Sequence, residues 1–244
     1  MKNFLILSAL LFFINTTDIF SQQEPSQYLN EGIAANEARA YEDAVKYLTQ
    51  YLNSDPQNAV GLYNRAVAYF FLKDFNNAQR DALAAIENNS NYKEAYNILG
   101  LTNTALILLP DAVSDFTSAI NIDPDYSEAY LNRALVFKQQ NDYARAVTDL
   151  NSALTISPGM LEAVFIRGQV LVSMGNYSDA IKDLTMYISS VPDKAAAFSV
   201  RGLAYYQVGN YPESVRDLEK AIRLDPGIEK DFTEVLNDAK SKMK

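Results

Sequence analysis

Residues 127–160 read SEAYLNRALVFKQQNDYARAVTDLNSALTISPGM, with two amphipathic segments, a polar turn between them and a proline close to the end. Steps of 34 residues from Pro158 in both directions reach a proline at every position but one, where a serine stands. The residues at this interval are Pro56, Ser90, Pro124, Pro158, Pro192 and Pro226. An interval this regular indicates one structural unit that is copied along the chain.

The interval divides most of the chain into six units of 34 residues, in which the proline or serine holds position 32. Positions 4, 8 and 11 form one stripe and positions 20, 24 and 27 form a second, with small residues at positions 8 and 20 throughout. Spacings of three and four residues place each stripe on one face of a helix, and the small residues allow two helices to pack closely. Each unit is therefore predicted to be a pair of helices. The units are residues 25–58, 59–92, 93–126, 127–160, 161–194 and 195–228.

These units resemble the tetratricopeptide repeat, whose motif has a large residue, leucine-glycine, tyrosine, alanine, phenylalanine, alanine and proline at these positions. In the fourth unit the matching residues are Tyr130, Ala134, Phe137, Ala146, Leu150, Ala153 and Pro158. The resemblance covers residues 25–228, although four units carry arginine where the motif has its leucine. It implies an all-α fold, an α-solenoid of stacked helix-turn-helix repeats. Residues 229–244 are predicted to form a helix that caps the last repeat.

Composition limits the chemistry that the chain can perform. The 244 residues include no cysteine and no histidine, and the formal net charge is −9. The missing side chains exclude disulfides, thiolate nucleophiles and Cys/His zinc sites, and the acidic balance disfavours nucleic acid as a partner. We expect no cofactor, no metal and no enzymatic activity. The alternative, catalysis by carboxylate pairs such as Asp111 with Asp115 or Asp179 with Asp183, is disfavoured because these acids are predicted to lie on a solvent face.

The first 21 residues have the layout of a secretory signal peptide. A short basic start precedes an apolar run of eleven residues, Phe4 to Ile14, and a more polar stretch ends at the small residue Ser21. The alternative is an uncleaved anchor, but eleven residues fall short of the roughly 20 that span a bilayer. We therefore predict a signal peptide over 1–21, a single domain over 22–244 without a membrane span, and a secreted or periplasmic protein.

The family resemblance implies that the first helix of each repeat lines a concave groove that binds protein or peptide segments. Positions 2, 5, 6, 9, 12 and 13 of each repeat point away from the stripe at 4, 8 and 11, and are predicted to face this groove. The predicted groove residues are Leu29, Asn30, Ile33, Tyr63, Asn64, Val67, Phe70, Phe71, Asn97, Leu101, Leu131, Asn132, Leu135, Lys138, Phe165, Gln169 and Tyr206.

The second repeat has the most apolar groove face. Its first helix is apolar on both stripes, so both sides must be covered, either by neighbouring repeats or by a ligand. We predict that Tyr63, Phe70 and Phe71 form an apolar binding patch. Lys138 is the one cation predicted in the groove, and a clamp for a C-terminal carboxylate needs several charged donors. The sequence therefore argues against that kind of ligand.

A second apolar feature interrupts the turn of the third repeat. Residues 105–109 read ALILL where other repeats have polar turns such as Gln139-Gln140-Asn141. This segment is either a second contact surface or the end of a first helix that runs long and tucks the segment inward.

The sequence favours a non-catalytic scaffold that is exported and binds peptide or helical segments in an apolar groove. Two alternatives remain open: a structural homo-oligomer held by the apolar patches, and an accessory subunit of a cell-envelope assembly complex.

Overall fold

The computed structural model describes residues 25–243, which form thirteen α-helices and one short 3-10 turn, with no strand in that range. The helices are α1 (Pro25–Glu37), α2 (Tyr41–Ser54), α3 (Ala59–Phe71), α4 (Phe75–Asn88), α5 (Lys93–Ala105), α6 (Leu109–Ile122), α7 (Ser127–Gln139), α8 (Tyr143–Ile156), α9 (Leu161–Ser173), α10 (Tyr177–Ser190), α11 (Ala195–Gln207), α12 (Tyr211–Leu224) and α13 (Glu229–Lys242), with the 3-10 turn at Pro226–Ile228. The predicted all-α solenoid is confirmed. The predicted signal peptide, 1–21, lies outside the described residues.

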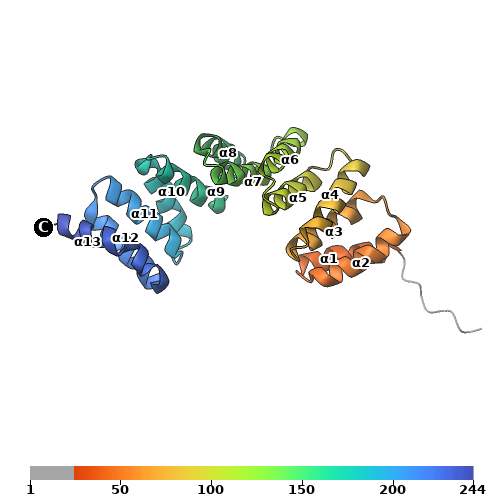
Figure 1. Cartoon of the computed structure of the whole chain (residues 1–244), viewed down its shortest axis with the longest axis horizontal. Coiled ribbons are helices and arrows are strands. Elements are labelled where there is room, and N and C mark those ends of the chain that lie inside the picture. The colour runs from red at the N-terminus through yellow and green to blue at the C-terminus, as the bar shows by residue number, and fades with distance from the viewer. Residues whose placement is uncertain (1–24, 244) are drawn as a thin grey trace, which may run out of the picture.

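The helices pack as six consecutive hairpins that follow one another along an open arch (Figure 1). Each second helix packs against its own first helix and against the first helix of the next repeat. The first helices also touch one another from repeat to repeat, whereas within residues 25–243 the second helices of successive repeats do not. The first helices therefore line the inside of the curve, which we call the inner face.

Glycine at position 8 allows the two helices of a repeat to approach closely. A Cβ atom added to Gly100 would lie 2.7 Å from the ring of Phe116, and one added to Gly32 would lie 2.5 Å from Cγ of Leu48. Phe116 and Leu48 are fully buried. Contacts this short exclude a larger residue unless the partner side chain moves.

The four arginines at position 7, which depart from the family motif, form one recurring ion pair. In the fourth repeat Nε and Nη2 of Arg133 both donate to the carboxylate of Asp149 at 2.8 Å, while Nη1 donates to Thr117 of the preceding repeat, also at 2.8 Å. The same two-point pairing joins Arg65 to Asp81, Arg167 to Asp183 and Arg201 to Asp217. In each of these repeats Nη1 of the arginine also donates a hydrogen bond to the preceding repeat. The acceptors of Arg65, Arg167 and Arg201 are Thr49, Asn151 and Thr185, in that order. The expected solvent position of Asp183 is wrong, because this pairing buries it.

The third repeat lacks this arginine. Leu99 holds its place, and Leu83 stands where the preceding repeat would supply the threonine or asparagine. Asp115 keeps the acid position without a cationic partner and accepts a hydrogen bond from Nδ2 of Asn103 at 2.7 Å. Asp115 is partly buried, so the expected solvent position is only partly correct for this acid. Burial raises the pKa of Asp115 to about 6, against an ordinary value of 3.8.

Asp115 is expected to make stability fall as pH rises. An acid whose folded-state pKa is raised favours folding below its unfolded pKa, and this contribution is lost as pH rises through about 6. We expect Asp115→Asn to reduce the loss of stability between pH 4 and pH 7 by about 1–2 kcal/mol, allowing for partial solvent screening. Urea unfolding at both pH values measures this, with exposed Asp125→Asn as the control. An unchanged difference in Asp115→Asn would contradict the assignment.

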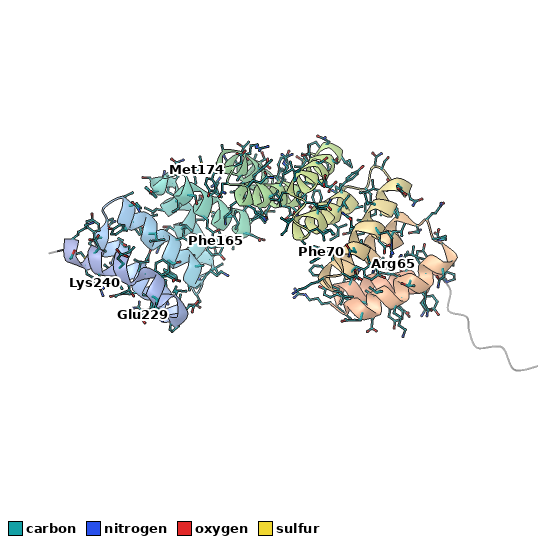
Figure 2. The ribbon with its side chains drawn as sticks, viewed as in Figure 1. Arg65, Phe70, Phe165, Met174, Glu229 and Lys240 are labelled. Atoms are coloured by element: carbon teal, nitrogen blue, oxygen red, sulfur yellow. The ribbon has the colours of Figure 1, made fainter. Side chains whose placement is uncertain are left out.

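The last helix, α13, covers the end of the array as predicted. Ala239 is buried against α12, and Lys240 forms an ion pair with Glu219 of that helix at 2.9 Å. Most other side chains of α13 remain in solvent (Figure 2), so the helix closes the apolar core with a polar outer surface. Among the helices described, none has the length and apolar character to cross a membrane.

Candidate functional site

The inner face is apolar at its N-terminal end and carries a row of acids farther along. Glu94, Glu128 and Glu162 all hold position 2 of their repeats, at the start of α5, α7 and α9. Figure 2 shows Phe70 and Phe165, from repeats far apart in the sequence, both on the inner side of the arch. The inner face thus combines exposed aromatic and aliphatic surface with negative charge.

Four aromatic rings pack together at the ends of helices in repeats 1 and 2. We call this group, Tyr41, Phe70, Phe71 and Phe75, the aromatic cluster. The rings of Tyr41 and Phe71 are stacked with centroids 4.7 Å apart and planes 10° from parallel. Phe70 meets Phe71 edge-on at 5.5 Å and Phe75 at 5.8 Å. Phe71 nevertheless remains 53% exposed. A large ring held rigidly by its neighbours and open to solvent is typical of a residue that anchors a partner.

The two adjacent phenylalanines have different surroundings. Phe70 packs against the buried cluster that includes Ile98 and Leu99, so it is partly a core residue. Phe71 contacts Tyr41 and Phe70 and faces solvent. A test of binding should therefore change Phe71 and leave Phe70 in place.

Tyr63 lies next to the aromatic cluster on the same helix, α3. Its ring packs at 4.9 Å against Tyr92, which comes just before α5. Burial raises the pKa of the Tyr63 hydroxyl, and the carboxylate of Glu94 adds to the increase. Tyr63 therefore stays a neutral hydrogen-bonding group at the border between the apolar and acidic parts of the inner face.

Several predicted groove residues are used in packing within the array. Leu131 is only 6% exposed and belongs to the core of the fourth repeat. The ring of Phe165 is stacked on Tyr187 with centroids 4.8 Å apart. Leu29 packs against the cores of the first two repeats. These side chains leave less surface for a ligand than their positions suggest.

The polar groove residues mostly link neighbouring first helices. Nδ2 of Asn132 donates to Oδ1 of Asn97 at 2.9 Å, and Nζ of Lys138 donates to Oε1 of Gln169 at 2.5 Å. Burial lowers the pKa of Lys138. Nδ2 of Asn64 donates to the Val60 carbonyl of its own helix at 2.8 Å. These bonds hold the spacing of the helices along the inner face.

The remaining predicted residues have varied exposure. Tyr206 donates a hydrogen bond to Asp238 and lies beneath Lys242, so α13 covers it. Asn30 is exposed. The partly buried members are Ile33, Val67, Leu101 and Leu135.

Three residues next to the site were missed from the sequence: Tyr41, Phe75 and Tyr92. A signal for the first two exists, because position 17 of the repeat is aromatic in five of the six repeats. Tyr92 follows the repeat's last turn, where the sequence shows no periodic signal. Only the three-dimensional packing brings Tyr41 to Phe71, Phe75 to Phe70 and Tyr92 to Tyr63.

The second half of the array also has surface cavities. One of about 460 Å³ lies between α8 and α10, lined by residues that include Asn151, Arg167 and Lys182. Across residues 25–243, no three acidic side chains gather in a way that could hold a metal ion. The inner face therefore remains the candidate functional site.

Comparison with known proteins gives consistent matches. Family profiles described as tetratricopeptide repeat match residues 59–92, 108–160 and 195–228. Human RNA polymerase II-associated protein 3 is 38% identical over 76 residues, which are 31% of this chain and 11% of that protein. Heat shock protein STI1 of Saccharomyces cerevisiae is 32% identical over 91 residues, which are 37% of this chain and 15% of that protein. The chain thus spans a small part of either relative.

Solved structures with the same fold cover most of the chain. The pilF protein of Pseudomonas aeruginosa has a TM-score of 0.76 at 16% identity and covers 89% of this chain and 97% of its own. YrrB is described as a TPR protein with an unusual peptide-binding site. Its structure has a TM-score of 0.66 at 20% identity, and the match covers 80% of this chain and 97% of YrrB. Identities this low establish the fold alone. With the six-fold motif and the helical hairpins, these matches show that the chain belongs to the tetratricopeptide repeat family, whose members bind protein partners.

Proposed function

We propose that the protein is an exported, non-catalytic scaffold that binds a peptide or helical segment of another protein on its inner face. The aromatic cluster around Phe71 carries the proposal. Its rings are positioned by stacking within the protein, so a partner gains contact area without first ordering a flexible side chain. The apolar surface of Tyr63 continues the cluster along α3.

The proposal of export rests on the N-terminal sequence alone. The basic start, the apolar run Phe4 to Ile14 and the small residue Ser21 have the order of a signal peptide. We propose that the mature chain begins at Gln22 and acts outside the cytoplasm, where it could serve as an accessory subunit of a cell-envelope complex. Intact mass of the protein from the cell envelope tests this, and a retained Met1 would contradict it.

Phe71→Ser is expected to remove partner binding while preserving the fold. Phe71 is more than half exposed, and the lost stacking costs about 0.5–1.5 kcal/mol of stability. Affinity capture from the native envelope, identified by mass spectrometry, should recover polypeptides with the wild-type protein that Phe71→Ser no longer recovers.

Val208→Ser is the matched control, because Val208 is 47% exposed and lies at the other end of the array. It should capture the same polypeptides as the wild type. If Phe71→Ser captures them equally well, the aromatic cluster is not the binding surface. Chemical unfolding of both variants shows whether a loss of capture reflects a loss of folding.

A further inference from the structure

The turn of the third repeat exposes an apolar surface that no other part of the chain covers in the described residues. Helix α5 ends at Ala105, as its counterparts do in the other repeats, so the interpretation that this helix runs long does not hold. Ile107 is 73% exposed and Leu108 is 40% exposed. Ile107 is the most exposed of the large apolar side chains described.

Ile107 also has an unfavourable backbone conformation. Its φ is 63°, in the left-handed region that side chains branched at Cβ rarely adopt. The corresponding turn residues in the other repeats are Arg39, Lys73, Asn141, Gly175 and Gly209, and all share a positive φ. Asparagine or glycine would relax the turn, and this chain uses both elsewhere. An isoleucine here is thus unfavourable twice, in conformation and in exposure, and nothing within one copy compensates for it. Such outliers concentrate at functional surfaces.

The charges around this turn indicate what covers it. The chain carries a net charge of −9, so most surfaces of two copies repel one another. Residues 105–110 have no ionisable side chain, and the exposed acid Asp111 follows them directly. Lys73 holds the equivalent turn position in the preceding repeat, and Asp111 lies in the first turn of α6. In a two-fold contact the same patch meets itself, which would allow Lys73 of each copy to pair with Asp111 of the other.

We propose that the third-repeat turn, Leu106 to Leu108, is a self-association surface that binds the same turn of a second copy of this chain. The contact uses the ends of the hairpins, where first and second helices join. It leaves both inner faces open to partners, and it does not depend on the proposed binding function. A pair of copies joined in this way presents two inner faces.

Sedimentation equilibrium of the purified protein tests the proposal. The average mass should rise from that of one chain toward that of two as the concentration increases from about 1 to about 100 µM, the range expected for a small interface. Ile107→Asn should stay at the mass of one chain throughout. The same variant should unfold at a higher temperature than the wild-type monomer, because asparagine tolerates the left-handed turn.

Matched variants separate the surface from general hydrophobicity. Met174→Asn removes an exposed apolar side chain from the turn of the fifth repeat and should self-associate as the wild type does. Lys73→Glu should weaken association, and Lys73→Glu with Asp111→Lys should restore it.

Three results would overturn the proposal. A wild-type protein that stays monomeric to about 100 µM has no such contact at relevant affinity. Association that survives in Ile107→Asn uses another surface. An Ile107→Asn variant that unfolds at a lower temperature would show that Ile107 supports the fold of a single copy instead. The capture experiment with Phe71→Ser is read independently, because Phe71 lies outside this turn.

Discussion

Arg133→Ala is expected to lower the free energy of unfolding by about 3–5 kcal/mol, because it leaves a buried carboxylate without its cation. Asp149, which accepts two hydrogen bonds from Arg133, is 4% exposed. The substitution also removes the bond from Nη1 to Thr117 across the repeat boundary. Urea unfolding followed by far-UV circular dichroism at pH 7 measures the loss.

Two further variants distinguish burial of the ion pair from charge alone. Arg145→Ala breaks an exposed pair with Asp142, whose shortest contact is 2.6 Å, and should cost less than about 1 kcal/mol. Arg133→Met with Asp149→Leu replaces both buried ions with apolar groups and should recover most of the stability that Arg133→Ala loses. If Arg133→Ala costs no more than Arg145→Ala, the buried pair does not stabilise the array.

The effect of Gly100→Ala on stability is expected to change sign with the residue that the added methyl group faces. In the wild type, the added methyl group meets the Phe116 ring at 2.7 Å, and this overpacking should cost about 1–3 kcal/mol. Phe116→Ala alone should cost about 3–5 kcal/mol, because it empties a fully buried position. In the Phe116→Ala background, Gly100→Ala partly refills the cavity and should increase stability.

The second repeat supports this expectation, since Ala66 and Ala82 hold the same two positions there and both are fully buried. A double-mutant cycle from urea unfolding should give a coupling of at least about 1 kcal/mol. Additive effects would show that the glycine is not required by the ring.

The repeat interval predicted the fold well, because its spacing depends only on local helix geometry and on packing that each unit shares. It placed the paired helices, the turns and the capping helix correctly. The arginines at position 7 appeared as departures, although each has an aspartate sixteen residues later. Recognising the pair requires the facing geometry of the two helices, which spacing along one helix does not reveal.

The candidate site was less predictable, because exposure on the inner face depends on the neighbouring repeat. Tyr63, Leu131 and Phe165 share position 5, yet their surroundings differ. Leu131 is buried in the core, Phe165 stacks on Tyr187, and Tyr63 packs on Tyr92. Periodicity gives the direction of a side chain, but the size of its neighbours determines how much of it a partner can reach.

The missing arginine of the third repeat has a mechanical consequence. At every other boundary between repeats, a guanidinium reaches the preceding second helix, whereas between repeats 2 and 3 a neutral bond from Gln79 to Asn103, at 2.7 Å, takes that role. If the array is pulled at its two ends, we expect repeats 2 and 3 to separate first. The array would then consist of two rigid segments, residues 25–92 and 93–243, joined by a flexible boundary. The arch could widen or narrow at this boundary to accommodate partner segments of different width.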